Sequence, residues 1–210
     1  DEIRKNLITL WNTYSFFVTY ANLDNFNPSN HKLENSDLTV LDKWILAKVN
    51  NFIKISDDYY NNFQVYKMVK KSAELLDDIS NWYVRRNRRR FWKSESDSDQ
   101  LAAYLTLYNV LLTYIKIMSP IIPFISDKIY RNIVSSIDKT APKSIHLTEY
   151  PIYNQKLENA KLISEIDAIK NIVTLGRSAR NKANIKIRQP LENLSVFSKK
   201  GVEEFVDLYE

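Results

Sequence analysis

Residues 63–92 read FQVYKMVKKSAELLDDISNWYVRRNRRRFW, the longest helical pattern in the chain. Apolar and small side chains recur in it every three or four residues, the spacing that places them on one face of an α-helix. These positions are Tyr66, Val69, Ala73, Leu76, Ser80 and Tyr83. A helix with one apolar face is stable only when that face packs against other elements, so the pattern predicts a partner layer.

Similar helical patterns lie on both sides of this stretch. The N-terminal one has the stripe Ile3, Leu7, Leu10, Trp11, Tyr14, Phe17, Val18 and Ala21. Further helices are expected at about 38–60, at about 100–118 and from Pro120 to about 136. The connections between them are short, except for the Asn-rich loop 23–37. Long helices joined by short loops predict an all-α, up-and-down helical bundle.

Local signals set the expected helix ends. Asp37 offers an N-cap for the second helix, since a short side-chain oxygen can accept a free backbone N–H. Ser119-Pro120 ends the helix that begins near residue 100, because proline lacks the backbone donor and disfavours helix at the residue before it. Pro120 and Pro123 then fit the first turn of the next helix.

The character of the chain changes after Ile137. Residues 144–151 alternate apolar and polar side chains as a short extended segment would, and a helix is expected over about 157–183. Residues 185–197 contain β-branched residues in alternation and suggest a strand or hairpin. We therefore expect a helical-bundle domain over 1–140, followed by a linker, a helix and the start of a truncated α/β junction domain over 141–210.

Composition excludes several classes of site. The 210 residues contain no cysteine, two histidines and two glycines. Thiolate nucleophiles, cysteine metal sites and glycine-rich nucleotide loops are therefore absent. The chain begins without Met and without a signal-peptide pattern, so we expect a segment of a longer cytoplasmic protein.

Positive charge is concentrated in two segments. Residues 82–93 and 170–188 each hold six Lys or Arg and no acid. Since the whole chain has a net charge of +5, the remaining residues carry −7. Concentrated positive charge on an acidic body is the distribution expected of a protein that contacts a polyanion.

The first basic segment combines arginines with tryptophans. At about 100° per residue, a helix places Trp82, Arg85, Arg89 and Trp92 within an arc of about 80°. Arg86, Arg88 and Lys93 flank that arc, while Arg90 and Phe91 border the core side. Guanidinium groups bind phosphates and indole rings stack on unpaired bases, so all eight Trp, Arg and Lys residues are candidate RNA-binding residues.

The same helix also fits roles that involve no RNA. An arginine-rich helix can be a solvated face, Trp82 can belong to the core, and polybasic helices also bind acidic proteins or anionic membranes. The alternative function is therefore an interaction module that binds an acidic protein or packs on the rest of its own parent protein.

The second basic segment lacks aromatic residues, so it favours phosphate contact without base stacking. Its candidate residues are Arg177, Arg180, Lys182, Lys186 and Arg188, and a polar interdomain hinge accounts for them equally well. Adjacent acids at 57–58 and 77–78 point about 100° apart on a helix, which fits a surface better than acid–base catalysis. Residues 104–125 are apolar, but Asn109, Lys116 and Ser119-Pro120 interrupt them, so we expect core helices and no membrane span.

Several motifs together resemble the isoleucyl-tRNA synthetases, a class I family. They are WNTYSFFVTYANLD (11–24), LDKWILAKVN (41–50), DDISNWYVRRNRRRFWK (77–93), MSPIIPFISDKIY (118–130), SIHLTEYP (144–151) and LGRSARNKANIKIRQPL (175–191). The resemblance covers nearly the whole chain, and NWYVRRNRRRFW followed by KANIKIRQPL is its most specific part.

The resemblance implies the helical anticodon-binding domain and the start of the junction region of such an enzyme. Its substrate would be the isoleucine-accepting tRNA, bound through the anticodon stem-loop, and it would be a monomer. The His-x-Gly-His and Lys-Met-Ser-Lys-Ser elements are missing, so this chain alone is expected to be inactive, with no catalytic residue, cofactor or metal. ATP and Mg would be used by the catalytic domain in cis, with the contact running through the first helix and its Trp11 and Phe17.

Overall fold

The computed structural model describes residues 2–33, 36–94 and 96–197. The chain divides into two compact units, Asp1–Glu158 and Asn159–Glu210. The division lies beyond the expected boundary at 140 because residues 141–158 bond to the first unit. Ser144 Oγ and the Ile145 N–H both donate to Asp127 Oδ1, at 2.6 and 3.0 Å.

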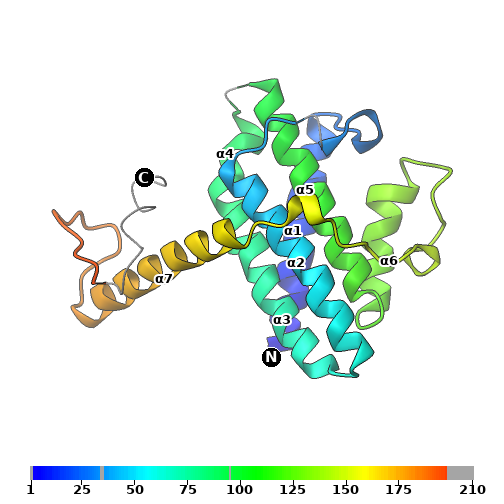
Figure 1. Cartoon of the computed structure of the whole chain (residues 1–210). Helices are drawn as coiled ribbons and strands as arrows, with labels where there is room; N and C mark the ends of the chain where they lie inside the picture. The colour runs from blue at the N-terminus through cyan, green and yellow to red at the C-terminus, as the bar shows by residue number, and fades with distance from the viewer. Residues whose placement is uncertain (1, 34–35, 95, 198–210) are drawn as a thin grey trace. The chain divides into compact units, whose positions relative to one another are not determined.

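The first unit is an up-and-down bundle, as predicted (Figure 1). Its four long elements are α1 (Glu2–Leu23), α2 (Val40–Asn61), the rod formed by α3 (Val65–Asp77), π-helical η3 (Asp78–Val84) and α4 (Arg85–Trp92), and α5 (Asp97–Met118). Tyr60 Oη donates to the carbonyl of Ile117 at 2.8 Å, so α2 and α5 end together. Gln100 Nε2 donates to Asp24 at 3.0 Å, so α1 ends where α5 begins.

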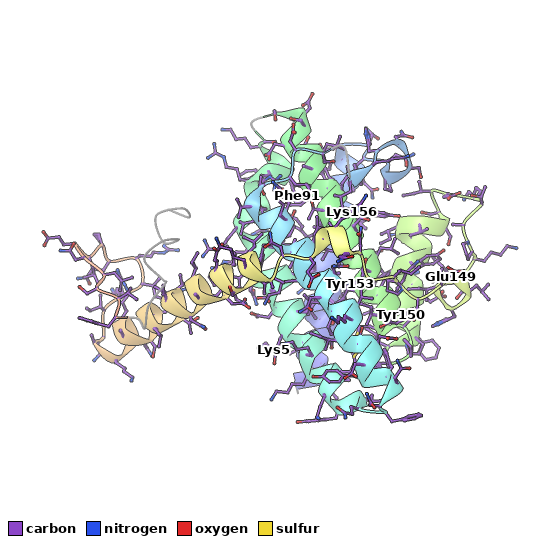
Figure 2. All side chains as sticks on the ribbon, in the orientation of Figure 1. Lys5, Phe91, Glu149, Tyr150, Tyr153 and Lys156 are labelled. Carbon is purple, nitrogen blue, oxygen red and sulfur yellow. The ribbon has the colours of Figure 1, made fainter. Side chains whose placement is uncertain are left out.

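These contacts define two ends of the bundle. At one end, α1 and α4 finish and α2 and α5 begin. We call it the arginine end, after the arginines of α4 (Arg85–Trp92). At the opposite end, α2 and α5 finish and α3 begins. The rod of α3, η3 and α4 runs from the opposite end to the arginine end, so it places side chains at both ends of the bundle. Figure 2 labels Phe91, near the arginine end of that rod.

The helix α5 forms the centre of the core. It is long and apolar enough to cross a membrane by length and composition, but 67% of its apolar window is buried inside the protein. Leu107, Leu111 and Ile115 are fully buried in it. A buried core helix accounts for this apolar stretch, as the sequence predicts for residues 104–125.

The helix α2 begins two residues later than the predicted Asp37 cap implies. Thr39 is the N-cap: its Oγ1 accepts from the Asp42 N–H at 3.3 Å, and Asp42 Oδ2 accepts from the Thr39 N–H at 2.9 Å. This reciprocal pair satisfies two free N–H groups, whereas a lone aspartate cap satisfies one. The Asp37 assignment was therefore wrong.

The predicted break after α5 is present. Pro123 lies in the first turn of α6 (Pro123–Tyr130), which continues as π-helical η4 (Arg131–Ser135). Pro120 lies in the connecting turn and not in the helix. Proline at the first helical position lacks a donor that would have no helical partner in any case.

The segment predicted to be extended at 144–151 contains a short 3-10 turn instead, η5 (Ile145–Leu147). The following residues run along α2, where Figure 2 labels Tyr150 and Tyr153. The hydroxyls of Tyr150 and Ser56 are 2.6 Å apart, and Lys54 Nζ lies 5.9 Å from the Tyr153 ring centroid. Side-chain contacts with α2 hold this segment, so it needs no strand partner.

The second unit contains α7 (Ala160–Lys182), close to the predicted helix. Asn184 follows with a φ of 55°, and the Ile185 N–H donates to the Arg180 carbonyl at 2.9 Å. This is a Schellman-type helix end with asparagine in the left-handed position that usually favours glycine. The strand or hairpin expected over 185–197 is absent, and none of the described residues of the chain forms a β-strand.

Candidate nucleic-acid interface

The orientation of α4 is set by two buried side chains, Asn87 and Phe91. The Phe91 ring makes edge-on contacts with Phe16 and Tyr104, each at a centroid distance of 5.1 Å. Asn87 Nδ2 donates to the Tyr83 carbonyl at 2.9 Å. These contacts turn one face of α4 inward, so the remaining side chains of the helix face outward.

The rod departs from the predicted helix in two ways. Residues 78–84 are π-helical, a rare form that occurs mostly as local insertions and often at functional sites. The apolar stripe of α3 also lies away from the predicted positions at its start, since Met68 is buried while Tyr66 is 83% exposed. The wider π turns bury Ile79 and Tyr83 and connect the stripes of α3 and α4.

Arg90 is held inside the protein by two carboxylates. Its Nη1 and Nη2 donate to the two oxygens of Asp42, both at 2.9 Å, and its Nε donates to Asp99 Oδ1 at 2.7 Å. The Asp42 side chain has no exposed surface, and that of Arg90 is 13% exposed. Burial opposes the charge of Arg90, but the hydrogen bonds and the charge of Asp42 outweigh it and raise the pKa of Arg90.

The Asp42 carboxylate joins three elements. It caps α2 through Thr39, it accepts from Tyr83 Oη in η3 at 2.6 Å, and it binds Arg90 in α4. Burial, together with the negative charge of Asp42, raises the pKa of Tyr83 well above its ordinary value. Helical spacing predicts that Arg90 borders the core, but it does not reveal Asp42 and Asp99 as its partners, because neither lies at helical spacing from it.

Trp82 and Trp92 differ in their surroundings, although the sequence placed them on one arc. Trp92 is 66% exposed, whereas Trp82 is half-buried and its ring lies under Arg86, whose Cζ is 4.3 Å from the ring centroid. Arg88 similarly lies 5.8 Å from the Phe16 centroid. Trp92 therefore presents the more open ring of the two.

The outer face of α4 keeps its positive charge available. Arg85, Arg88, Arg89 and Lys93 are exposed, and their side chains form no ion pair or hydrogen bond within residues 2–33, 36–94 and 96–197. Arg85, Arg89 and Trp92 are spaced by four and three residues, so they share a face of the helix. This face combines free guanidinium groups with an open indole ring.

The second basic segment belongs to the other unit, Asn159–Glu210. Arg177, Lys182, Lys186 and Arg188 are exposed. Arg180 instead holds the chain after α7, because its Nη1 donates to the carbonyl of Gln189 at 2.7 Å and to that of Lys186 at 3.1 Å. Four of the five predicted side chains are therefore open to solvent.

The paired acids act in structure or face solvent. Asp78 is buried and forms an ion pair with Lys48 at 2.8 Å, while its neighbour Asp77 is exposed and accepts from Asn81 Nδ2 at 2.6 Å. The described residues contain no group of three or more His, Asp or Glu side chains that could hold a metal ion.

Comparison with known proteins identifies relatives along nearly the whole chain. A family model described as the anticodon-binding domain of tRNA ligase matches residues 42–196. The isoleucine–tRNA ligase of Clostridium novyi (strain NT) is 44% identical over 205 residues, which cover 98% of this chain and 20% of that protein. The corresponding proteins of Clostridium tetani and Dehalococcoides mccartyi (strain CBDB1) are 47% and 43% identical, each over 92% of this chain and 18% and 19% of their own length. The chain thus spans about a fifth of the relatives it matches.

Proposed function

The chain belongs to the anticodon-binding-domain family of tRNA ligases, and on that premise we propose that it is the tRNA-binding part of an isoleucine–tRNA ligase. The outer face of α4 is the contact surface for the anticodon stem-loop. The observation that carries this proposal is the exposed set Arg85, Arg88, Arg89 and Trp92, on a helix that the buried Arg90–Asp42 pair fixes in place.

The exposed cations and the open ring have different roles in this proposal. Arg85, Arg88, Arg89 and Lys93 bind phosphates, which sets the register of the RNA without reading its sequence. Trp92 stacks on an unpaired base or packs on a sugar. We assign stacking to Trp92 and not to Trp82, because Arg86 covers one face of the Trp82 ring. Arg90 supports the helix and leaves phosphate binding to its neighbours.

In the C-terminal unit, we propose that Arg177, Lys182, Lys186 and Arg188 add phosphate contacts of their own. Their exposure, and the lack of aromatic residues within the sequence segment 170–188, fit electrostatic binding without stacking. Arg180 is left out, since it bonds to the backbone carbonyls of its own loop.

The parent protein would be a monomeric cytoplasmic enzyme that activates isoleucine with ATP and transfers it to its tRNA. ATP and Mg would bind in the catalytic part of that enzyme, since the His-x-Gly-His and Lys-Met-Ser-Lys-Ser elements of the family do not occur in this chain. We propose that this chain contacts the catalytic part through α1. Trp11 is 41% exposed there, whereas Phe17 is buried in the bundle and drops out of the expected contact.

The salt dependence of tRNA binding tests the proposal. The affinity for an isoleucine-tRNA transcript should fall as salt rises from 50 to 200 mM, and the four phosphate contacts on α4 alone should contribute a factor of roughly 150 to that fall. Replacing Arg85 and Arg89 with Ala removes two contacts, so the slope of log affinity against log salt should fall by about 1.8. Exchanging Lys139 and Lys143, two exposed lysines of a loop, for Ala is the matched control.

Two results would contradict the proposal. One is an affinity for tRNA that does not change with salt. The other is an equal loss of affinity in the loop-lysine variant and in the arginine variant, which would indicate unspecific attraction to net charge. An anticodon-swapped tRNA measured in parallel separates phosphate contact from base reading, since loss of a phosphate contact weakens both RNAs alike.

A further inference from the structure

The opposite end of the rod carries a second cluster of exposed aromatic and basic side chains. It is formed where α2 ends and α3 begins, and we call it the α3 corner, defined by Phe63, Tyr66, Lys67 and Lys70. Phe63 is 91% exposed and Tyr66 is 83% exposed. Aromatic rings of this size are normally buried or partnered, so their joint exposure requires a physical reason.

Phe63 occupies a backbone position that suits glycine. Its φ is 54°, and the bonds from the Phe63 N–H to the Tyr60 carbonyl and from the Gln64 N–H to the Tyr59 carbonyl close the end of α2 in a Schellman motif. A bulky side chain in the left-handed region is strained, and the exposed ring gains no packing in return. Strain of this kind that lacks structural compensation points to a use for the side chain.

The lysines of the α3 corner are also unfavourable for folding alone. Lys67 and Lys70 repel each other at i, i+3, and Lys67 lies in the first turn of α3, at the positive end of the helix dipole. The first turn of α3 contains no acid. Within the described ranges Lys67 and Lys70 form no ion pair or hydrogen bond, while the neighbouring Lys71 is paired with Glu74 at 2.8 Å.

We propose that the α3 corner is a second RNA-binding site, in which Lys67 and Lys70 bind phosphates and Phe63 and Tyr66 pack on an unstacked base or sugar. The proposal rests on the proposed function and extends it, since the same folded RNA would contact both ends of one rod. Arg88 follows Lys70 by 18 positions, which corresponds to about 27 Å at the rise of an α-helix. Glu74 and Asp77 lie between, so the two contacts are separate and do not form one continuous basic track.

A folded RNA is favoured over a protein as the partner because of the combination of groups. Aromatic rings beside unpaired cations match a base next to its phosphates. An apolar protein surface would leave Lys67 and Lys70 to be desolvated without partners, which is costly. Among the described residues, no acid of α2 forms an ion pair or hydrogen bond with Lys67 or Lys70, and Asp58 Oδ1 accepts instead from Asn62 Nδ2 at 3.0 Å.

The first test removes the two lysines in the 210-residue chain. We expect Lys67→Ala with Lys70→Ala to lower the slope of log tRNA affinity against log salt by about 1.8 and to weaken binding about 30-fold at roughly 150 mM salt. The loop variant Lys139→Ala with Lys143→Ala, which has the same net charge, should change neither value. The Arg85 and Arg89 double variant is measured beside them.

The second test separates binding from folding at Phe63. Phe63→Gly relieves the strained backbone, so the midpoint of thermal unfolding should rise, while tRNA affinity should fall by about fivefold to 150-fold with the loss of one stacking contact. A ring with a merely structural role would give no such opposite change. Tyr66→Ala serves as a second aromatic variant at a position without backbone strain.

The outcomes distinguish this inference from the proposed function. If the arginine variant loses affinity and the lysine and Phe63 variants do not, the α3 corner is not an RNA site and the surface serves a protein partner, while the proposed function stands. If neither pair of variants changes binding, both proposals fail. Loss in both pairs, with the loop control unchanged, supports two contacts on one RNA.

Discussion

Replacing Arg90 with Met should destabilise the bundle without removing a phosphate contact. Methionine keeps much of the side-chain volume but leaves the fully buried Asp42 carboxylate without its cation. Breaking a buried ion pair by removing one partner costs about 3–5 kcal/mol. Asp42 retains the Tyr83 hydroxyl and the Thr39 N–H, so we expect about 3 kcal/mol, at the lower end of that range.

A double-mutant cycle makes the magnitude specific to the pair. Asp42→Asn should cost about 2 kcal/mol, because it weakens both the Arg90 bridge and the cap of α2. The double variant should cost about 3 kcal/mol rather than about 5, a coupling of about 2 kcal/mol between the two residues. Arg85→Met is the matched control, and as a change on an exposed surface it should cost less than about 0.5 kcal/mol.

Urea unfolding followed by tryptophan fluorescence measures these differences, since Trp44 is fully buried and reports on the core. Coupling below about 0.5 kcal/mol would refute the role assigned to the Arg90–Asp42 pair. The same variants should be titrated with tRNA at several salt concentrations. Arg90→Met should leave the salt slope unchanged, whereas Arg85→Met should reduce it by about 0.9. A reduced slope in the Arg90 variant would return Arg90 to the phosphate-binding set.

Four further results are expected. Phe63→Gly should raise the free energy of unfolding by about 1 kcal/mol, as measured in urea, because glycine adopts a positive φ without strain. Stability should fall as the pH rises above about 10, since burial raises the pKa of Tyr83 and raises that of Tyr108 to about 12, while unfolded tyrosines ionise near 10; absorbance and circular dichroism together follow this. Partial burial opposes the charge of Asp127, but the hydrogen bonds donated by Ser144 and Ile145 lower its pKa. Its contribution to the free energy of unfolding should therefore be present at neutral pH and be lost as the pH falls through that lowered pKa, which carbon-detected NMR titration can measure. Arg180→Ala should speed amide hydrogen exchange in the loop after α7 and leave the bundle amides unchanged, because its bonds lie within that loop.

The helices of the bundle could be predicted because each needs only a local pattern. Stripes at three- and four-residue spacing identified α1, α2 and α7, and Ser119-Pro120 identified the end of α5. The helix α6 begins at Pro123, three residues after the expected start at Pro120. The Asp37 cap failed because the choice between Asp37 and Thr39 depends on a reciprocal bond with Asp42, which a single residue type does not reveal. The strand expected over 185–197 failed because alternation without a partner strand does not fix a structure.

The candidate site could be predicted in composition but not in detail. The charge and the aromatic content of residues 82–93 are visible in the sequence, and so is the inward position of Phe91. The sequence does not reveal which of these side chains are held by other elements and which are open to solvent, because this depends on contacts between residues far apart in the chain. Arg90 binds Asp42 across 48 positions, and Arg88 lies over the ring of Phe16 on another helix. The α3 corner was missed because Tyr66 fits the apolar stripe by spacing and is excluded from it only by the packing of Met68.

The carboxylate of Asp42 couples the local unfolding of three segments that are far apart in the sequence. The first turn of α2, the π-helical residues around Tyr83 and the last turns of α4 each lose a bond when that carboxylate moves. Their amide protons should therefore exchange with solvent at one common opening free energy, well above that of a frayed helix end. Any ligand that holds the arginine helix closed would then slow exchange at the start of α2, a segment it need not touch.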